Sequence, residues 1–397
     1  MSAPAILPFH MRRSGFDPAP ELSALRDDEG VRRITTPFGV DAWLVTRFAD
    51  VRAVLSDYEL FRIVPRPELE RGAAKLSDED AARLRAGNLL GVDPPDHTRL
   101  RRMLTGEFTV RRMRRLEPRI REIVDAHLDA MEREGPPADL VTSFALPIPS
   151  LVICELLGVP YSDRDEFQRR SNRLLDISIP LVDRVAAQGE MRGYMSELVA
   201  RAKADPGDDL LGMLVREHGD ELTDAELAGI GSLLLVAGHE TTSNMLSLGT
   251  LALLRHPEQL GLLAKEPERI DEAVEELLRW LSIVHAVTIK VATRDTEVGG
   301  RAIAAGELVM CSIPAANRDP ALLPDGDRLD IARAGAGHVA FGHGVHHCLG
   351  APLARMEMRT AYPALLRRFP TLREVEPGPR FRSFHIVYGL ASLPVAW

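Results

Sequence analysis

Apolar residues recur at every third or fourth position through most of the chain, which is the spacing of amphipathic helices. The pattern runs almost without pause from about residue 96 to residue 281. Before it, we expect the Pro-rich first residues to be irregular and residues 87–95 to form a loop. Besides one long helix, the pattern predicts helices over residues 50–55, 98–104, 116–134, 150–157, 164–179, 182–204, 209–218, 268–281 and 351–366.

The long helix has clear signals at both ends. Thr223-Asp-Ala-Glu226 is a capping box, so the helix should begin at about Asp224, and His256-Pro257 should end it. A helix of roughly 30 residues is about 45 Å long, enough to cross a whole domain. Its centre, residues 233–237, is apolar on every side, which predicts burial all round.

Short apolar runs follow residue 281 and predict strands instead. We expect strands at residues 42–46, 287–292, 296–298, 302–303 and 308–312, together with a C-terminal hairpin. The expected fold class is therefore mainly α with a smaller β region, in a single domain over residues 1–397. Its β-rich parts are about 30–65 and 285–315 plus the hairpin, and its helical parts are about 96–281 and 351–366.

Composition excludes several classes of protein. The chain of 397 residues has a formal net charge of −9, which disfavours general nucleic-acid binding. Its three cysteines, Cys154, Cys311 and Cys348, are far apart, so we expect neither a disulfide framework nor a zinc finger. The start does not resemble a signal peptide, and no apolar run reaches the ~18 residues of a membrane span. We expect a cytoplasmic protein that contacts neither membrane nor nucleic acid.

One cysteine lies in a loop with unusual chemistry. Phe341-Gly-His-Gly-Val-His-His-Cys-Leu-Gly350 places Cys348 directly before a predicted helix. Backbone N–H groups and the positive end of that helix would stabilise a thiolate. Gly344 and Gly350 would let the backbone approach a flat ligand. His346 can donate to an anionic group, and Phe341 can pack on an aromatic plane.

Two other interpretations of this loop stay open on the residues alone. A lone cysteine beside a glycine turn is more often an inert buried thiol than a ligand. A zinc ion is the second alternative, because four potential ligands lie close together: His343, His346, His347 and Cys348. A structural zinc site usually takes its ligands from two separated pairs, and the sequence offers no second pair.

The spacing Phe-x-x-Gly-x-His-x-Cys-x-Gly is the signature loop of the cytochrome P-450 family, the haem-thiolate monooxygenases. The chain resembles this family over nearly its whole length, and most of all its actinobacterial members that act on macrolides, terpenoids, sterol-like compounds and statin precursors. The resemblance implies haem b ligated by the Cys348 thiolate, with the long helix crossing over the haem. It implies a monooxygenase that uses O2 to hydroxylate or epoxidise an apolar small molecule.

A polar motif interrupts the long apolar helix at Ala237-Gly-His-Glu-Thr-Thr. Gly238 lowers helix stability, and a threonine hydroxyl can bond back to a carbonyl and distort the helix. A kinked helix with satisfied polar side chains is the plain interpretation. The resemblance implies an oxygen-binding groove at Ala237 and Gly238, with Glu240 and Thr241 as the catalytic acid and alcohol that deliver protons.

Further matches concern the support of the haem. Glu276-x-x-Arg279 is ordinarily a surface pair, but here it resembles the family's structural Glu-x-x-Arg, with Arg328 as third member. Alone, His97 and Arg101 describe one face of an exposed basic helix. The resemblance implies that they contact the haem propionates, as do His346 and Lys290, where the family often has arginine.

Arginines cluster between Arg99 and Arg119, although the chain is acidic. DNA binding and a solvated face without partner are the alternatives to a docking surface for an acidic electron donor. No flavin or nicotinamide domain fits in this length, so we expect electrons from a ferredoxin and its reductase.

The substrate contacts follow from the resemblance and are apolar. Residues 164–179 and 182–204 are candidates for a mobile lid, and we expect a monomer. A haem-thiolate sensor without turnover and a peroxide-using hydroxylase remain alternatives, although an acid-alcohol pair disfavours both. The residues expected to face the substrate are Leu90, Leu234, Ala237, Val287, Ile289, Ile386 and Val387.

Overall fold

The computed structural model describes residues 7–36, 40–63, 78–285, 289–333, 335 and 337–397. The helices are α1 Pro20–Asp28, α2 Phe48–Ser56, α4 Asp78–Arg85, α5 Asp96–Thr105, α6 Val110–Glu134, α7 Pro147–Leu157, α8 Arg164–Leu175, α9 Leu181–Ala204, α10 Leu210–His218, α11 Asp224–Arg255, α12 Pro257–Lys265, α13 Ile270–Leu281, α14 Ile313–Ala316 and α15 Ala351–Arg368. The strands are β1 Arg13–Ser14, β2 Asp17–Pro18, β3 Val31–Thr35, β4 Asp41–Val45, β5 Phe61–Ile63, β6 Ala138–Asp139, β7 Ile289–Ala292, β8 Thr296–Val298, β9 Arg301–Ile303, β10 Leu308–Cys311, β11 Arg373–Glu374, β12 Arg380–Phe381, β13 Leu390–Ser392 and β14 Pro394–Ala396.

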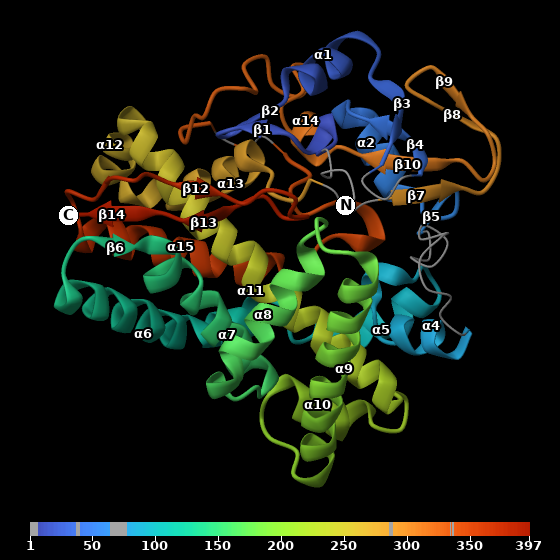
Figure 1. The fold of residues 1–397 in the computed structure, drawn as a ribbon, viewed down its shortest axis with the longest axis horizontal. Helices are drawn as coiled ribbons and strands as arrows, with labels where there is room; N and C mark the ends of the chain where they lie inside the picture. The colour runs from blue at the N-terminus through green and yellow to red at the C-terminus, as the bar shows by residue number, and fades with distance from the viewer. Residues whose placement is uncertain (1–6, 37–39, 64–77, 286–288, 334, 336) are drawn as a thin grey trace.

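The helix α11 organises the molecule, as its sequence predicts. The Thr223 hydroxyl accepts from the Glu226 N–H, the Glu226 carboxylate accepts from the Thr223 N–H, and the helix ends at Arg255. It crosses the molecule in Figure 1 and packs against α7, α9 and α15. Its apolar side chains are buried on nearly every side, in the largest hydrophobic core of the protein.

The β region is a five-stranded mixed sheet in the order β3-β4-β10-β7-β5. β10 runs parallel to β4 and antiparallel to β7, whose other neighbour is β5. The sheet lies beside the helical part, at the upper right of Figure 1. The prediction of a mainly α fold with a smaller β region is confirmed.

Some predicted boundaries were wrong for identifiable reasons. The Pro-rich start contains the helix α1, whose first residue, Pro20, suits a helix start because its missing N–H needs no partner there. The helix α6 begins at Val110, not residue 116, because the Thr109 hydroxyl accepts the Arg112 N–H. The helix α8 stops at Leu175, not residue 179, because the chain then turns to pair with His385.

Candidate active site

Cys348 lies in the turn between the irregular stretch after α14 and the helix α15. Its N–H donates to Phe341 O at 2.8 Å, which closes the loop on itself. Gly342 and Gly344 both have a positive φ, +71° and +70°, so the loop needs residues without a side chain at these points. The helix begins at Ala351, the first residue of the range predicted for it. Its first turn still points N–H groups toward the sulfur.

The ionisation of Cys348 is a balance between burial and donors. The residue as a whole is exposed, yet enough protein surrounds the sulfur that burial raises the pKa of the thiol. The N–H groups of Gly350 and Ala351 and the charges of Arg101 and Arg355 lower this pKa in part. The predicted thiolate-stabilising groups are therefore present, but burial outweighs them. A positive metal centre at the sulfur would complete the ionisation.

The two glycines singled out in the sequence have different roles. A Cβ at Gly344 would lie 2.6 Å from the Leu55 carbonyl oxygen, so this glycine allows the loop to pack on the backbone of α2. That reason differs from the predicted approach to a flat ligand. A Cβ at Gly350 would have no atom of the described residues within 4 Å. Its predicted role toward a ligand stays a prediction, as does the aromatic contact of Phe341, whose ring lies beneath the Arg355 guanidinium.

The structure brings together the residues predicted to bind carboxylates. The His97 and His346 rings are 4.3 Å apart, and His346 Nε2 lies 3.4 Å from Asp93 Oδ1. Lys290 is 1% exposed, and its Nζ has no hydrogen-bond partner among the described residues; the same holds for His346 Nδ1. Burial lowers the pKa of Lys290, which the Asp93 charge raises in part. Buried donors without partners are costly, so this cluster fits an anionic group such as the haem propionates.

Arg101, the fourth member of this predicted set, belongs to the cysteine side of the cluster. Its pKa is lowered by burial and raised by the Cys348 charge, so the guanidinium lies close enough to the sulfur to affect it. The pKa of His97 falls to about 4 because of burial and the charges of His346 and Arg101. His97 is therefore neutral at physiological pH, and it can act as a hydrogen-bond donor rather than as a cation.

The middle of α11 presents one open face. Ala237 is exposed and Thr241, one turn later, is half-buried, whereas Leu234 is 9% exposed. Thr241 Oγ1 donates to Ala237 O at 2.9 Å, which is the back-bonding expected from the sequence, and the helix is continuous through the motif. Gly238 faces elsewhere, because a Cβ there would meet the Ile153 side chain of α7. Its predicted contact with a cofactor stays a prediction.

Glu240 is buried and held by a residue that the sequence did not indicate. Arg382 Nη1 donates to Glu240 Oε2 at 3.0 Å, and His239 Nε2 lies 3.6 Å from Oε1, too far for a hydrogen bond. Burial would raise the pKa of Glu240, but the neighbouring His239, Arg382 and His385 lower it well below its usual value. The Arg382 contact is the direct one, and we take it as the main cause of the ionised state.

The Glu-x-x-Arg pair is buried and supports the cysteine loop. Arg279 donates to both oxygens of Glu276, at 2.7 and 2.8 Å, and at 2.7 Å to the carbonyl oxygens of Asn317 and Gly326. Asn317 Oδ1 accepts from the Val339 N–H, which precedes the loop. These bonds fix the chain that leads to Cys348.

The third member of this network is a correction to the sequence prediction. The Arg328 side chain is 64% exposed and pairs with Asp325 and Asp330; only its backbone oxygen accepts from Arg279, at 3.3 Å. Arg333 is the side chain that approaches Glu276, with Nε 3.5 Å from Oε1. Both arginines lie in one irregular stretch, and sequence spacing does not tell which one turns inward.

The residues predicted to face a substrate are dispersed in the structure. Leu90 is 50% exposed, whereas Ile289 packs with Leu44 and Met310 under the sheet. Ile386 contacts the core around Met11, and Val387 belongs to the main core. Val287 lies outside the described residues. These contacts stay predictions.

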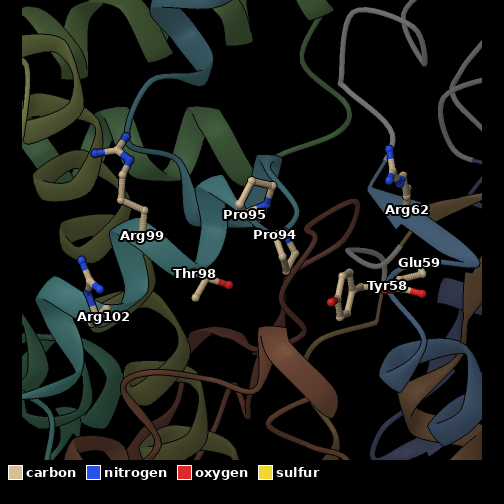
Figure 2. A pocket seen from close by; sticks show the side chains of 8 residues that line it. All are labelled: Tyr58, Glu59, Arg62, Pro94, Pro95, Thr98, Arg99 and Arg102. Atoms are coloured by element: carbon tan, nitrogen blue, oxygen red, sulfur yellow. The ribbon is translucent and has the colours of Figure 1, made fainter.

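A surface groove of about 700 Å³ lies between α5 and β5 (Figure 2). None of the residues predicted to bind haem or substrate lines it, but Arg99 and Arg102 of the predicted basic patch do. Within the described ranges, no helix is long and apolar enough to cross a membrane. In the same part of the chain, no three His, Cys, Asp or Glu side chains gather in a way that would hold a metal ion, so the zinc alternative gains no support.

A mainly helical protein with a long buried helix, a cysteine turn and a cluster of nitrogen donors, one of them the buried and unpartnered Lys290, has the architecture of a haem-thiolate protein. Comparison with known proteins agrees. The family model described as Cytochrome P450 matches residues 187–390. The chain is 50% identical to "Cytochrome P450 FAS1" of Rhodococcoides fascians over 401 residues, covering 100% of both chains. It is 44% identical to "Vitamin D(3) 25-hydroxylase" of Pseudonocardia autotrophica, covering 96% of this chain and 93% of the relative.

Among solved structures, CYP105P1 in complex with filipin I has a TM-score of 0.91 and 40% identity, covering 100% of this chain and 99% of that one. The chain belongs to the cytochrome P450 family. It is therefore a haem-dependent monooxygenase, which uses haem b with a cysteine thiolate ligand and O2.

Proposed function

We propose that Cys348 is the thiolate ligand and that the enzyme hydroxylates an apolar small molecule of secondary metabolism. The observation that carries the assignment is the joint placement of an accessible Cys348 and the unpartnered Lys290 Nζ and His346 Nδ1 in this fold. When bound, haem supplies the oxygen chemistry, and thiolate donation favours O–O cleavage. The propionates would be held by His97, Arg101, Lys290 and His346.

The other proposed roles, substrate binding and proton delivery, belong to side chains of the protein itself. The open face of α11 at Ala237 and Thr241 gives room for a small molecule beside a hydroxyl that can pass on protons. The names of two similar proteins, a vitamin D(3) hydroxylase and a P450 in complex with filipin I, support an apolar substrate class. Glu240 and Thr241 would then deliver protons, and the exclusion of other water from the site would protect the reaction.

The ligand is tested with the carbon monoxide difference spectrum of the reduced protein. We expect wild type to show the band typical of a thiolate-ligated haem, and Cys348→Ser to lack it. Cys154→Ala, which removes a buried thiol in α7, is the matched control and should keep the band. A band that survives in Cys348→Ser would exclude this residue as the ligand.

The role of Thr241 is tested by the coupling of oxygen consumption to product. Thr241→Ala should release peroxide at the expense of product, because the hydroxyl that passes on protons is lost. Thr250→Ala is a close control: its Oγ1 also bonds back along α11, to Leu246 O at 2.8 Å, but it is 1% exposed and away from the open face. Equal coupling in both variants would remove Thr241 from the proton path.

Electrons would come from a ferredoxin that docks on the arginine-rich α5–α6 surface. Several of these arginines are engaged within the protein, for example Arg119 with Glu155 and Arg112 with Glu107. Arg102, on the rim of the groove in Figure 2, is exposed and can meet an acidic partner. Arg102→Glu should slow electron transfer at low salt and lose this effect at high salt. A rate that does not depend on the charge at this position would place the docking surface elsewhere.

A further inference from the structure

Two buried histidines have ring nitrogens that meet no hydrogen-bond partner among the described residues. His10 lies in the short turn Phe9–Met11 and is 3% exposed, and neither of its ring nitrogens is bonded. His285 follows α13 and is 7% exposed, and its Nδ1 has no partner in the same part of the chain. A polar atom that is buried without a partner costs free energy. A bound polar group that supplies the missing hydrogen bonds would remove this cost.

Both histidines lie beside Ile386, in the turn between β12 and β13. The Ile386 side chain packs with Met11, which is the next residue after His10. The backbone nitrogen of His285 lies 3.5 Å from Ile386 O, and its ring Nε2 lies 2.8 Å from His385 O. His10 is near enough that a charge on it would lower the pKa of His285. The two rings therefore belong to one region of the molecule.

The hydrogen bonds that the two rings can still make follow from their protonation. A carbonyl oxygen only accepts, so Nε2 of His285 carries the hydrogen that faces His385 O. Burial lowers the pKa of His285 to about 3 and that of His10 to about 4, so both rings are neutral at physiological pH. Nδ1 of His285 can then only accept, whereas His10 offers one donor and one acceptor. A hydroxyl group fits both rings, because it can donate to His285 and accept from His10.

An anionic group fits this region less well. The positive charge of Arg13 lies nearby and lowers the pKa of His285 further, but its guanidinium is bound elsewhere. It donates to Leu281 O and Ser282 O, each at 2.7 Å, and lies over the Tyr388 ring, 4.6 Å from its centre. A carboxylate accepts only, so its oxygens would face the lone pair of His285 Nδ1. The region therefore favours a neutral hydroxyl over a carboxylate.

The surroundings of the two rings are apolar. Met11 and Ile386 are buried, and half-buried aliphatic side chains pack against them from two other segments. The exposed parts of these side chains mark the edge at which the region meets solvent. A molecule whose hydroxyl is held between the rings would thus place hydrocarbon against hydrocarbon. The half-buried residues are Leu7, Leu175 and Ile177.

We propose that His10 and His285 bind the hydroxyl group of an otherwise apolar alcohol and thereby select the substrate of the enzyme. The proposal rests on the proposed function for the oxidation of this alcohol, whereas its binding does not depend on that function. No bond is made or broken at the two rings, because they hold the hydroxyl while another carbon of the molecule is oxidised. An isomer that has no hydroxyl leaves the ring nitrogens unpaired and binds less tightly.

The first experiment measures the binding of three probes to the haem-loaded full chain by titration calorimetry. The probes are n-decanol, its isomer nonyl methyl ether, and decanoate. We expect n-decanol to bind about tenfold more tightly than the ether, whose oxygen has no hydrogen to donate to His285. Decanoate should bind no better than the ether. Equal binding of the alcohol and the ether, tighter binding of decanoate, or no binding of the alcohol would overturn the proposal.

The second experiment repeats the titrations with variants of the two rings. His10→Leu and His285→Leu should each lower the affinity for n-decanol by about tenfold and leave that for the ether unchanged. His285→Gln should restore most of the preference, because its amide can donate to His385 O and accept from the alcohol. His127→Leu is the matched control and should keep the preference, since His127 is a half-buried residue of α6 whose Nδ1 lies 2.8 Å from Ile123 O.

The stability of His10→Leu separates binding from a structural role. Neither ring nitrogen of His10 has a partner among the described residues, so the variant should be at least as stable as wild type. Lower stability with an unchanged preference for the alcohol would make His10 structural and overturn the proposal. This variant decides the matter alone if His285→Leu does not fold. Loss of the carbon monoxide band in every protein, with the preference intact, would count against the proposed function and not against this site.

Discussion

Arg279 and Arg382 each hold a buried glutamate, one below the cysteine turn and one on the long helix. Arg279 donates two bonds to Glu276 and three to backbone carbonyls, and its side chain is 1% exposed. Arg382 donates one bond to Glu240 and is 17% exposed. The first arrangement fixes one geometry. The second depends on a single bond from the turn between β12 and β13.

The difference matches the role that we propose for each side. A metal ligand must stay in place through every step, and Cys348 is held by a backbone loop that the Arg279 network anchors through Asn317 and Val339. A proton donor must change state during each cycle, and a lightly held carboxylate can do so. We therefore expect the cysteine side of the candidate active site to be rigid and the side of Glu240 to be adjustable.

The strongest test of the rigid side is Arg279→Ala. Removal of one partner from a buried ion pair leaves Glu276 charged and without compensation, so the free energy of unfolding should fall by about 3–5 kcal/mol. Chemical unfolding of the two proteins measures this difference. Arg328→Ala, which removes an exposed side chain of the same stretch, should change it by less than about 0.5 kcal/mol. Similar losses in both variants would mean that the Arg328 side chain does support Glu276. They would contradict the assignment of that role to Arg333.

Two glycines allow a direct comparison between the sides. Gly344→Ala should destabilise the protein by about 2–3 kcal/mol, because the φ of +70° is strained for alanine and its Cβ meets the Leu55 backbone. Gly238→Ala in α11 should destabilise the protein less than Gly344→Ala does, since the gain in helix propensity, about 1 kcal/mol, offsets part of the clash of its Cβ with the buried Ile153 side chain. Thermal and chemical unfolding would measure both.

The outcome that would break the comparison is a larger loss at Gly238 than at Gly344. It would mean that the packing of α11 on α7 is the more rigid of the two, and that the side of Glu240 does not adjust. Haem content should be measured in the same samples. A Gly238→Ala variant that folds but binds haem weakly would support the predicted contact between this residue and the cofactor.

Local signals explain why much of the fold could be predicted from the sequence. The start and end of α11 follow from a capping box and a His-Pro pair, and both are properties of a few adjacent residues. The helix α8 was predicted too long because its apolar spacing continues, while the backbone of Ile177 is instead used by Phe384. That pairing is tertiary, and no local pattern records it. The prediction of a single domain stays a prediction.

The residues of the candidate site also differ in whether a local sequence pattern could predict them. The cysteine loop, Glu240 and Thr241 were found because each lies in a short motif. Arg382 was missed, because 142 residues separate it from Glu240 and an arginine in a hairpin has no pattern of its own. The choice between Arg328 and Arg333 also depends on which side chain turns inward in an irregular stretch. Motifs therefore locate the reacting groups, whereas their supporting partners require the three-dimensional structure.

The smallest effect that we predict is a difference in how the two sides make the stability of the protein depend on pH. His285 supports the turn between β12 and β13, where its Nε2 lies 2.8 Å from His385 O. Its pKa falls from 6.5 to about 3, first because of burial and then because of the Arg13 charge. The folded state thus binds this proton less well than the unfolded state does. Stability should be complete above pH 6.5 and fall as the pH drops from 6.5 toward 3, by about 1.4 kcal/mol per pH unit for this one group.

Unfolding measured between pH 8 and pH 5 would show this slope, and His285→Gln should flatten it, because an amide can still donate to His385 O but cannot take up a proton. His10, whose pKa falls to about 4 through burial, adds a similar slope that the variant retains. On the rigid side, Glu275 of α13 accepts two bonds from Arg355, which lies over Phe341 of the cysteine loop. Burial raises the pKa of Glu275, but Arg355 and His338 bring it down to about 2, so its contribution to stability also falls as the pH drops, but only below about pH 4.5. If His285→Gln keeps the full wild-type slope above pH 5, then acid does not act through the turn, and the two sides do not differ in how they respond to protons.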